Sequence, residues 1–422
     1  MAEATDAPVV VRGQGSVLPA TGGTLPLRFE LYPDHFTVSC GATPITGAYR
    51  ELTAVAVDQG RVLITLGAGN VRLLVEQLGA GLGQLVGELR ERRARQMLTD
   101  RLIDLPESER LELVEFRTGE DHGVAQLAFH AWGMAIIPLD ERLAWWLIRR
   151  ADLAEVRPDQ PTGRVRLDVA ARPGREGVSI ELLGLGLDTV RMADRVAGMR
   201  VGALGDAAAI VNGLLPGAAF EVRNQAAGLL VDGRPISREQ LGDAWAPIER
   251  AVLSEPTFAA TYAALVARSG SSGSHAKSWM SIAPVTPTDP TEHMSWFLVA
   301  LPTDLLAFEL VSEGTHATYL FRARDSLEAA VFDVSEALID TRFLRSAIYL
   351  TEAALADPAR SRQRLAVASL PSLRAARARF VGRLIHVDEE SWARSLDDAI
   401  RWNSANLDAT IPWPGTDQSE GD

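Results

Sequence analysis

The sequence is poor in the residues that form cross-links and metal sites. It has one cysteine, Cys40, in 422 residues, which excludes an internal disulfide and any zinc site built from several cysteines. We interpret this cysteine as a buried, inert thiol. The seven histidines show neither HxH nor HExxH spacing, and no GxSxG sequence marks a serine nucleophile. We therefore expect no catalytic residue, no cofactor and no metal.

Long apolar runs and an excess of positive charge are also missing. No apolar stretch of about 18 residues indicates a membrane-spanning helix, and the first residues lack the pattern of a signal peptide. The 42 basic and 55 acidic residues give a net charge of −13, which disfavours binding of nucleic acid or of an anionic membrane by the whole surface. Only Lys277 is a lysine, a bias that we interpret as the mark of a GC-rich bacterial genome. We expect a cytoplasmic protein that does not insert into a membrane.

Alternation of apolar and polar residues dominates the first hundred residues. The period of two is typical of half-buried strands, and apolar residues three and four apart are typical of a helix. Together they predict several strands closed by one helix. The strands are expected at 25–31, 36–38, 52–57, 61–66 and 71–78, and the helix at 81–98.

The same pattern returns about one hundred residues later. Five residues, Glu51, Leu52, Val55, Asp58 and Gln59, match the residue class found 101 positions later, and Gly60-Arg61-Val62 recurs as Gly163-Arg164-Val165, a shift of 103. Leu66–Gly69 also resembles Leu183–Gly186, and an added hairpin around Arg172 would account for the longer second copy. A helix at 199–215 would close it. Chance similarity between short apolar stretches is the alternative.

Both predicted helices carry small residues four positions apart. Glycine inside a helix costs about 1 kcal/mol relative to alanine, so we expect the helices to approach a sheet closely at these positions. A helix–helix contact in a dimer is the alternative. The small residues are Gly79, Gly83 and Gly87 in the first helix and Gly205, Ala209 and Gly213 in the second.

In element order and tandem arrangement, the two copies resemble the pleckstrin-homology-like (PH-like) superfold. That fold is a partly opened barrel of about seven strands capped by a helix, and its members bind peptides, proteins or lipids. In phosphoinositide-binding members, basic residues gather in the loop between the first two strands. Here the corresponding turns, Pro33-Asp34 and Trp132-Gly133, contain neither lysine nor arginine, which argues against phosphoinositide binding.

These observations predict an α+β fold. Two tandem antiparallel β-barrel-like modules, each closed by a helix, would be followed by a helical spacer, a third small β-sheet region and C-terminal helices. The expected segments are a flexible tail at 1–24, PH-like modules at 25–105 and 106–215, the spacer at 216–270, the third β region at 271–325, the helical region at 326–405 and a flexible tail at 406–422.

Within the later segments, local signals refine the prediction. Ser237 and Gln240 have the spacing of a capping box, which predicts a helix over 238–253. Pro371 is expected to break the helical stretch 358–384. The sequence Gly270–Ser278 resembles a phosphate-binding loop, but Ala276 stands where the glycine before the lysine belongs. We therefore interpret 269–274 as a Ser/Gly linker.

Two short stretches are candidates for an interaction surface. Trp145 and Trp146 precede Arg149 and Arg150, and neighbours on a strand face opposite sides, so one tryptophan is expected to be exposed beside an arginine. Burial of both tryptophans is the alternative. Arg374 and Arg377 belong to the basic stretch 358–384, which would either bind an acidic partner or form a solvated helix face.

The sequence thus favours a non-catalytic cytoplasmic binding or scaffold protein that contacts another protein through its β modules. Its C-terminal helices would serve either as a docking surface or for self-association into a homo-oligomer. One alternative is binding of a lipid or small apolar ligand by a β module. The other is an enzyme of unknown reaction with a site near the third β region, using His275, His293 or His316.

Overall fold

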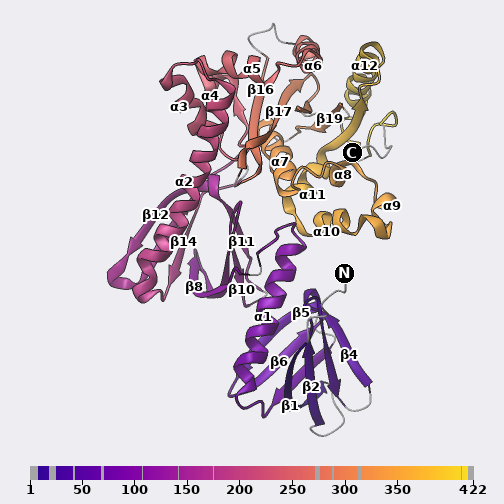
Figure 1. Ribbon diagram of the computed structural model, residues 1–422. Coiled ribbons are helices and arrows are strands. Elements are labelled where there is room, and N and C mark those ends of the chain that lie inside the picture. The colour runs from indigo at the N-terminus through magenta and orange to yellow at the C-terminus, as the bar shows by residue number, and fades with distance from the viewer. Residues whose placement is uncertain are drawn as a thin grey trace, which may run out of the picture. The chain divides into compact units, whose positions relative to one another are not determined.

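The computed structural model has an α+β fold with two seven-stranded antiparallel sheets and a third sheet of six strands (Figure 1). Its contacts divide the chain into two compact units, Met1–Ile148 with Val156–Leu167 and Ser179–Ala193, and Arg149–Glu155 with Asp168–Val178 and Asp194–Asp422. The described residues are 8–18, 25–40, 43–67, 71–106, 108–140, 142–173, 175–270, 276–287, 289–311, 316–324, 326–409 and 411–416.

The first sheet has the strand order β4-β3-β2-β1-β7-β6-β5. Helix α1 (Gly81–Thr99) buries Leu85 and Leu89 in the core of this sheet, beside Phe29 and Phe36. The strands are β1 (Val9–Leu18), β2 (Leu25–Leu31), β3 (His35–Cys40), β4 (Thr43–Ala48), β5 (Leu52–Asp58), β6 (Arg61–Leu66) and β7 (Val71–Glu76), with a 3₁₀ turn η1 (Tyr49–Glu51) before β5.

The expected flexible tail at 1–24 is wrong for Val9–Leu18, which form β1 between β2 and β7. Glycines at 13 and 15 interrupt its apolar pattern, which is why the sequence did not indicate a strand. A Cβ at Gly15 would lie 2.1 Å from the carbonyl oxygen of Leu74. Glycine is therefore needed there for the close approach of the neighbouring strand.

The second sheet repeats the order of the first, as β11-β10-β9-β8-β14-β13-β12. Its strands are β8 (Glu112–Thr118), β9 (Asp121–His130), β10 (Gly133–Pro138), β11 (Trp146–Arg149), β12 (Leu153–Asp159), β13 (Arg164–Val169) and β14 (Val178–Leu183). Turns η2 (Arg150–Asp152) and η4 (Gly186–Asp188) precede β12 and α2 (Thr189–Leu214).

The spacing of 101 residues holds for two pairs of elements. Turn η1 and strand β5 start at residues 49 and 52, and η2 and β12 start at 150 and 153. The match of Leu66–Gly69 to Leu183–Gly186 is wrong, because Leu66 ends β6 whereas Leu183 ends β14. The connection between β13 and β14 does contain an isolated antiparallel bridge, between Arg172 and Arg175.

The expected close packing of the helix glycines against a sheet is also wrong. A Cβ at Gly83, Gly87, Gly205 or Gly213 would meet nothing within 4 Å. In addition, α2 begins ten residues before the expected start at Met199, because η4 leads directly into it.

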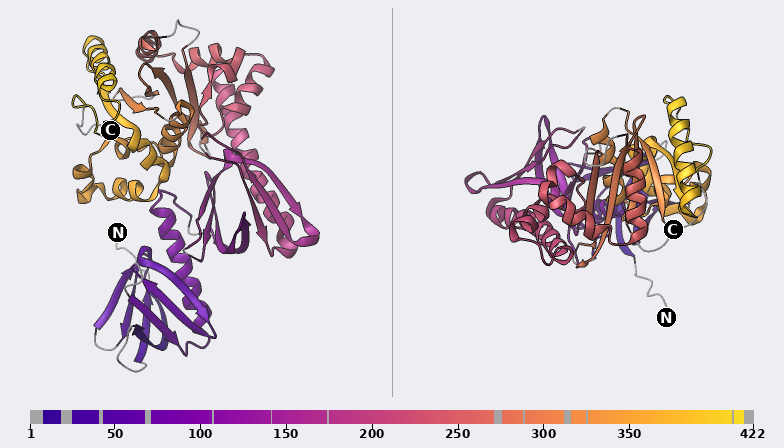
Figure 2. Two further views of the ribbon diagram at one scale, coloured as in Figure 1. Left: turned by 180° about the vertical axis from the view of Figure 1, so that it is seen from behind. Right: turned by 90° about the horizontal axis from the view of Figure 1, so that it is seen from above.

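The third sheet has the order β15-β16-β17-β18-β19-β20 and is covered by helices on both faces (Figure 2). Phe297 and Val299 pack with residues of α5, α6 and α12, whereas Trp296 donates a hydrogen bond to Ser335 of α7. The strands are β15 (Ile236–Ser237), β16 (Ser278–Thr286), β17 (Asp289–Leu301), β18 (Leu305–Val311), β19 (Ala317–Arg322) and β20 (Phe380–Ile385).

The helices of this region are α3 (Phe220–Leu229), α4 (Arg238–Leu241), α5 (Trp245–Val252), α6 (Pro256–Arg268), α7 (Leu327–Asp340), α8 (Ser346–Tyr349), α9 (Glu352–Leu355), α10 (Ser361–Ser369), α11 (Pro371–Arg379) and α12 (Glu389–Ala405). The capping box of Ser237 and Gln240 is confirmed. The helix it caps nevertheless ends at Leu241, because Gly242 adopts a positive φ of 55°. The break at Pro371 is confirmed, since α11 begins there.

Two boundaries in this region need correction. Residues 380–385 form β20, not a helix, because their apolar residues pair with β19; β15 and β20 therefore lie outside the expected third β region. The tail at 406–422 is not wholly free, since the backbone N–H of Trp413 donates to the carbonyl of Val381. Residues 417–422, and residues 271–275 of the expected linker, lie outside the described residues.

Candidate functional site

Arg150 lies at the start of η2 and is buried, with 6% of its surface exposed. Its guanidinium donates to both carboxylate oxygens of Asp232, at 3.0 and 2.7 Å, and to Asp206 of α2 at 2.7 Å. The expectation that Arg150 belongs to an exposed contact surface is therefore wrong. The cause is the pair of carboxylates, which neutralise a charge that burial would otherwise make costly.

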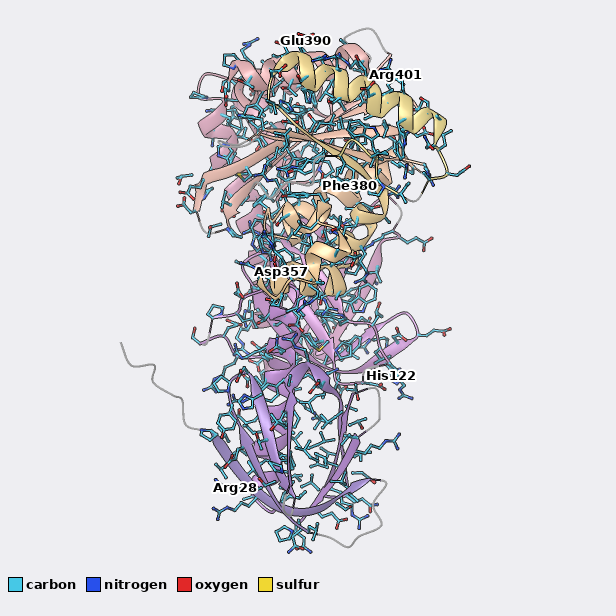
Figure 3. All side chains as sticks on the ribbon, turned by 90° about the vertical axis from the view of Figure 1, so that its right-hand side faces the viewer. Arg28, His122, Asp357, Phe380, Glu390 and Arg401 are labelled. Atoms are coloured by element: carbon cyan, nitrogen blue, oxygen red, sulfur yellow. The ribbon has the colours of Figure 1, made fainter. Side chains whose placement is uncertain are left out.

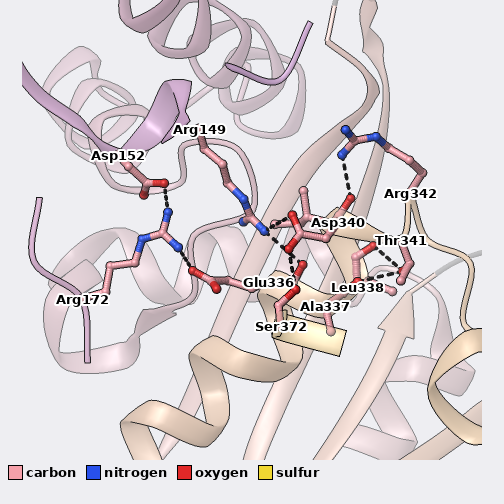
Figure 4. A network of polar contacts seen from close by, with 11 residues as sticks. Arg149, Asp152, Arg172, Glu336, Ala337, Leu338, Asp340, Thr341, Arg342 and Ser372 are labelled. Atoms are coloured by element: carbon pink, nitrogen blue, oxygen red, sulfur yellow. Dashed lines mark hydrogen bonds and ion pairs between the residues drawn. The ribbon is translucent and has the colours of Figure 1, made fainter. Parts of the chain in front are cut away.

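Arg149 is engaged in the same way by α7 (Figure 4). Its guanidinium donates to the Asp340 carboxylate at 2.6 Å and to the Glu336 carbonyl at 3.0 Å. Ser372 of α11 donates to the other oxygen of Asp340. This arginine too has its charge satisfied inside the chain.

Arg172 completes what we call the arginine cluster, namely Arg149, Arg150 and Arg172 with their carboxylate partners. It comes from the connection between β13 and β14 and pairs with Asp152 and with Glu336 of α7 (Figure 4). The cluster therefore links η2 and this connection to α7 within the second compact unit.

Burial and neighbouring charges together shift the pKa values of two groups in the cluster. Burial by itself raises the pKa of Asp340, but Arg149 and Ser372 outweigh it and hold that pKa below its ordinary value. Burial, with the positive charge of Arg149, lowers the pKa of Arg172 to about 9. Both groups are therefore charged at neutral pH.

Two clefts lie beside Arg172. One, of about 420 Å³, is lined by Arg149, Asp232 and Arg234 among others. The other, of about 510 Å³, is lined by Arg175, Asp333 and Arg379. Residues of the arginine cluster line part of both clefts, beside apolar side chains such as Phe332. Their ion pairs hold η2 and the connection between β13 and β14 to α7.

The other residues expected at an interaction surface are also engaged within the chain. The Arg101 guanidinium lies 3.1 Å from the ring centroid of Trp145, and Trp145 packs against a cluster that includes Leu98. Trp146 is half-buried at the start of β11. Both tryptophans are therefore partly covered, and neither projects as an isolated anchor.

In the basic stretch, Arg377 donates to the carbonyls of Ala347 and Leu350 at 2.9 and 2.8 Å and pairs with Glu352. It thereby satisfies backbone groups at the end of α8. Arg374 is exposed and donates to the carbonyl of Ala368 at 2.6 Å. Of these two arginines, only Arg374 lies on the surface.

The histidines considered for catalysis do not assemble a site. His275 is outside the described residues, and His293 and His316 are half-buried. The phosphate-loop candidate falls partly outside the described residues as well, and Lys277 is exposed. Among the described residues, no group of three or more His, Cys, Asp or Glu side chains could hold a metal ion.

Sequence reasoning missed a buried polar group in the third sheet. Thr318 donates to the fully buried Glu309 at 2.7 Å and accepts from the indole of Trp392 at 3.0 Å. The Nε2 atom of His386 lies 2.9 Å from the same hydroxyl. A single glutamate between Phe308 and Leu310 was the available signal, because an acid inside an apolar strand requires a buried partner.

Sequence reasoning also missed an exposed apolar patch on the second sheet. Val114 and Ala125 pair with each other and are buried, so their neighbours Leu113 and Val124 point to the opposite face. Leu113 is 62% exposed, Val124 is 42% exposed and Leu187 of η4 is fully exposed. Leu113 and Val124 lie on the same face of the paired strands β8 and β9, because Val124 pairs with Glu115, two residues from Leu113. We call Leu113 and Val124 the outer patch.

No helix in the described part of the chain is long and apolar enough to cross a membrane. Comparison of the sequence with protein-family models gives no match, and a search of curated proteins finds no significantly similar sequence. The functional interpretation therefore rests on the geometry of this chain.

Proposed function

We propose that the chain is a non-catalytic binding or scaffold protein of the cytoplasm, and that it binds another protein through the outer patch of the second sheet. We further propose that the two seven-stranded sheets with their closing helices are tandem PH-like modules. The shared strand order and the shared position of the 3₁₀ turns support the second proposal.

The exposure of Leu113 and Val124 is the observation that carries the binding function. Single exposed apolar residues are ordinary on a protein surface, but two on one face of neighbouring strands form an apolar spot that a partner can cover. Covering one such side chain contributes about 1.5–3 kcal/mol. The two residues can supply the centre of an interface.

Charged groups border the patch and give it the polar rim of an interface. Arg117, on the same face of β8 as Leu113, lies 3.5 Å from Glu181 of β14. His122 is exposed at the start of β9 (Figure 3). The Arg117 and His122 side chains are exposed in the free protein and can contact a partner.

A charge placed in the patch tests the proposal. We expect Leu113→Asp with Val124→Asp to abolish recovery of the partner from the native host, because a buried carboxylate in the contact would lack a counter-ion. The melting temperature should stay nearly unchanged, since the substituted side chains are exposed. Native mass spectrometry of the purified protein, beside its denatured mass, gives the readout.

The matched control is Val57→Asp, an equally exposed valine (44%) on the first sheet, which should keep the partner. Retention of every bound protein by the patch variant would contradict the proposal. A small molecule that leaves on denaturation, with no bound polypeptide, would instead support the ligand-binding alternative.

A further inference from the structure

The outer edge of β20 is covered by the chain's own C-terminal segment. β20 is the last strand of the third sheet, and Gly382 and Leu384 pair with Leu320 and Thr318 of β19. The carbonyl of Val381 and the N–H of Arg383 point away from β19, since both bond to residues of the C-terminal segment. An edge with such unpaired groups is a template for another strand.

Residues 413–416 satisfy those outward groups. The N–H of Trp413 donates to the Val381 carbonyl at 2.7 Å, and the Arg383 N–H donates to Oγ1 of Thr416 at 2.8 Å. The indole of Trp413 is half-buried and packs against the core of the third sheet. The N–H of Thr416 also donates to the carbonyl of Trp413 at 3.0 Å, so the segment binds the edge as a β-turn with one aromatic anchor.

Gly382 makes this contact possible. A Cβ there would lie 2.6 Å from Oγ1 of Thr416 and 3.3 Å from the Trp413 ring. Glycine inside a strand weakens it and commonly marks the close approach of another backbone. The composition of β20 therefore fits a strand that receives a peptide.

The segment is held by few contacts. Pro412 and Pro414 flank Trp413, are exposed, and have no N–H to extend a ladder. Ile411 is 62% exposed. Such a segment can leave the edge at small cost, and the same contacts can then be made by the same segment of another molecule.

We propose that the outer edge of β20 is a docking site for a Trp-Pro-Gly-Thr β-turn, occupied in this chain by residues 413–416, and that it accepts the same segment from a second copy. The observation is independent of the outer patch, so failure of either proposal leaves the other intact.

The test measures binding of a fluorescent peptide spanning residues 411–416 by anisotropy. A chain ending at Ala409 has a vacant edge and keeps the carbonyl that Arg322 and Arg324 contact. We expect it to bind the peptide at least tenfold more tightly than the intact chain does. Adding Gly382→Val to the shortened chain should abolish binding, as should Trp413→Ala in the peptide.

Absence of binding to the folded shortened chain would overturn the proposal, as would equal binding to the shortened chain and to its Gly382→Val variant. If the shortened chain does not fold, the full-length chain with Trp413→Ala and Thr416→Val replaces it with the same expectation. The second-copy contact is tested by light scattering of concentrated intact chain. A dimer that the shortened chain does not form supports it, and the same mass for both chains contradicts it.

Discussion

Tyr49 and Arg150 occupy the same position in two similar settings, 101 residues apart at the start of η1 and η2. Tyr49 is fully buried and its hydroxyl donates to the Tyr32 carbonyl at 2.7 Å. Arg150 is also buried but needs Asp232 and Asp206 to balance its charge. The same position therefore contributes to the local hydrophobic core of the first sheet, whereas in the second sheet it pairs with carboxylates from distant segments.

Removing one carboxylate of the arginine cluster should destabilise the chain strongly. Asp340→Asn leaves Arg149 buried without its counter-ion, for which we expect a loss of about 3 kcal/mol or more in the free energy of unfolding. Chemical denaturation measures it. Asp397→Asn removes the more exposed pair with Arg268 and should cost less than about 1 kcal/mol. Equal effects would contradict the structural role assigned to the cluster.

The free energy of unfolding should also fall at acid pH, and part of this loss should depend on Asp340. Its pKa in the folded chain is below the ordinary value of 3.8, so the unfolded chain binds the proton more readily. The stabilisation is present above the unfolded-state pKa and is lost as pH falls through the folded-state pKa. Unfolding free energies measured from pH 6 downward through that range should decline less steeply for Asp340→Asn. Equal slopes would exclude Asp340 as a source of the acid sensitivity.

At the scale of elements, helix α2 carries glycines that no contact in the described structure requires. A methyl group at Gly205 would meet nothing within 4 Å, and the φ of this residue is not positive. Gly233, by contrast, has a φ of 75°, and a Cβ there would lie 2.5 Å from Trp296. The structure therefore requires glycine at position 233 but not at position 205.

Alanine should accordingly have opposite effects at these positions. We expect Gly205→Ala to raise the free energy of unfolding by about 1 kcal/mol, because alanine favours the helix. Gly233→Ala should lower it, since both the backbone and Trp296 would have to move. Thermal or urea denaturation distinguishes them. A loss of stability in Gly205→Ala would show that a second molecule covers this face of α2.

For the whole molecule, the elements that local periodicity controls were predicted better than the features that depend on distant contacts. The alternation of Arg61–Leu66 predicts β6 with the observed bounds, and helix α1 starts at the expected Gly81. Strand β20 was missed because six residues between two helices have too little pattern to separate a strand from a helix turn. The α+β class was confirmed, whereas closed barrels were not observed among the described strands.

The candidate sites were less predictable because their residues meet only through the fold. Arg149 and Asp340 are 191 positions apart, and nothing near either residue indicates the other. The expected exposure of Arg150 depended on a local strand pattern, which carries no information about α2 and Asp232. The outer patch was missed for a related reason, since alternation shows that a strand has two faces but not which one the sheet buries.

The buried ion pairs of the second sheet have a consequence for how the chain evolved. If the two modules arose by duplication, an arginine at position 150 would have been strongly destabilising before Asp206 and Asp232 were present, because its buried guanidinium would have had no counter-ion. The first module, with a buried tyrosine at position 49 and a shorter connection between β6 and β7, then preserves the older form. The second module would have acquired its charges as an adaptation to the neighbour that it gained.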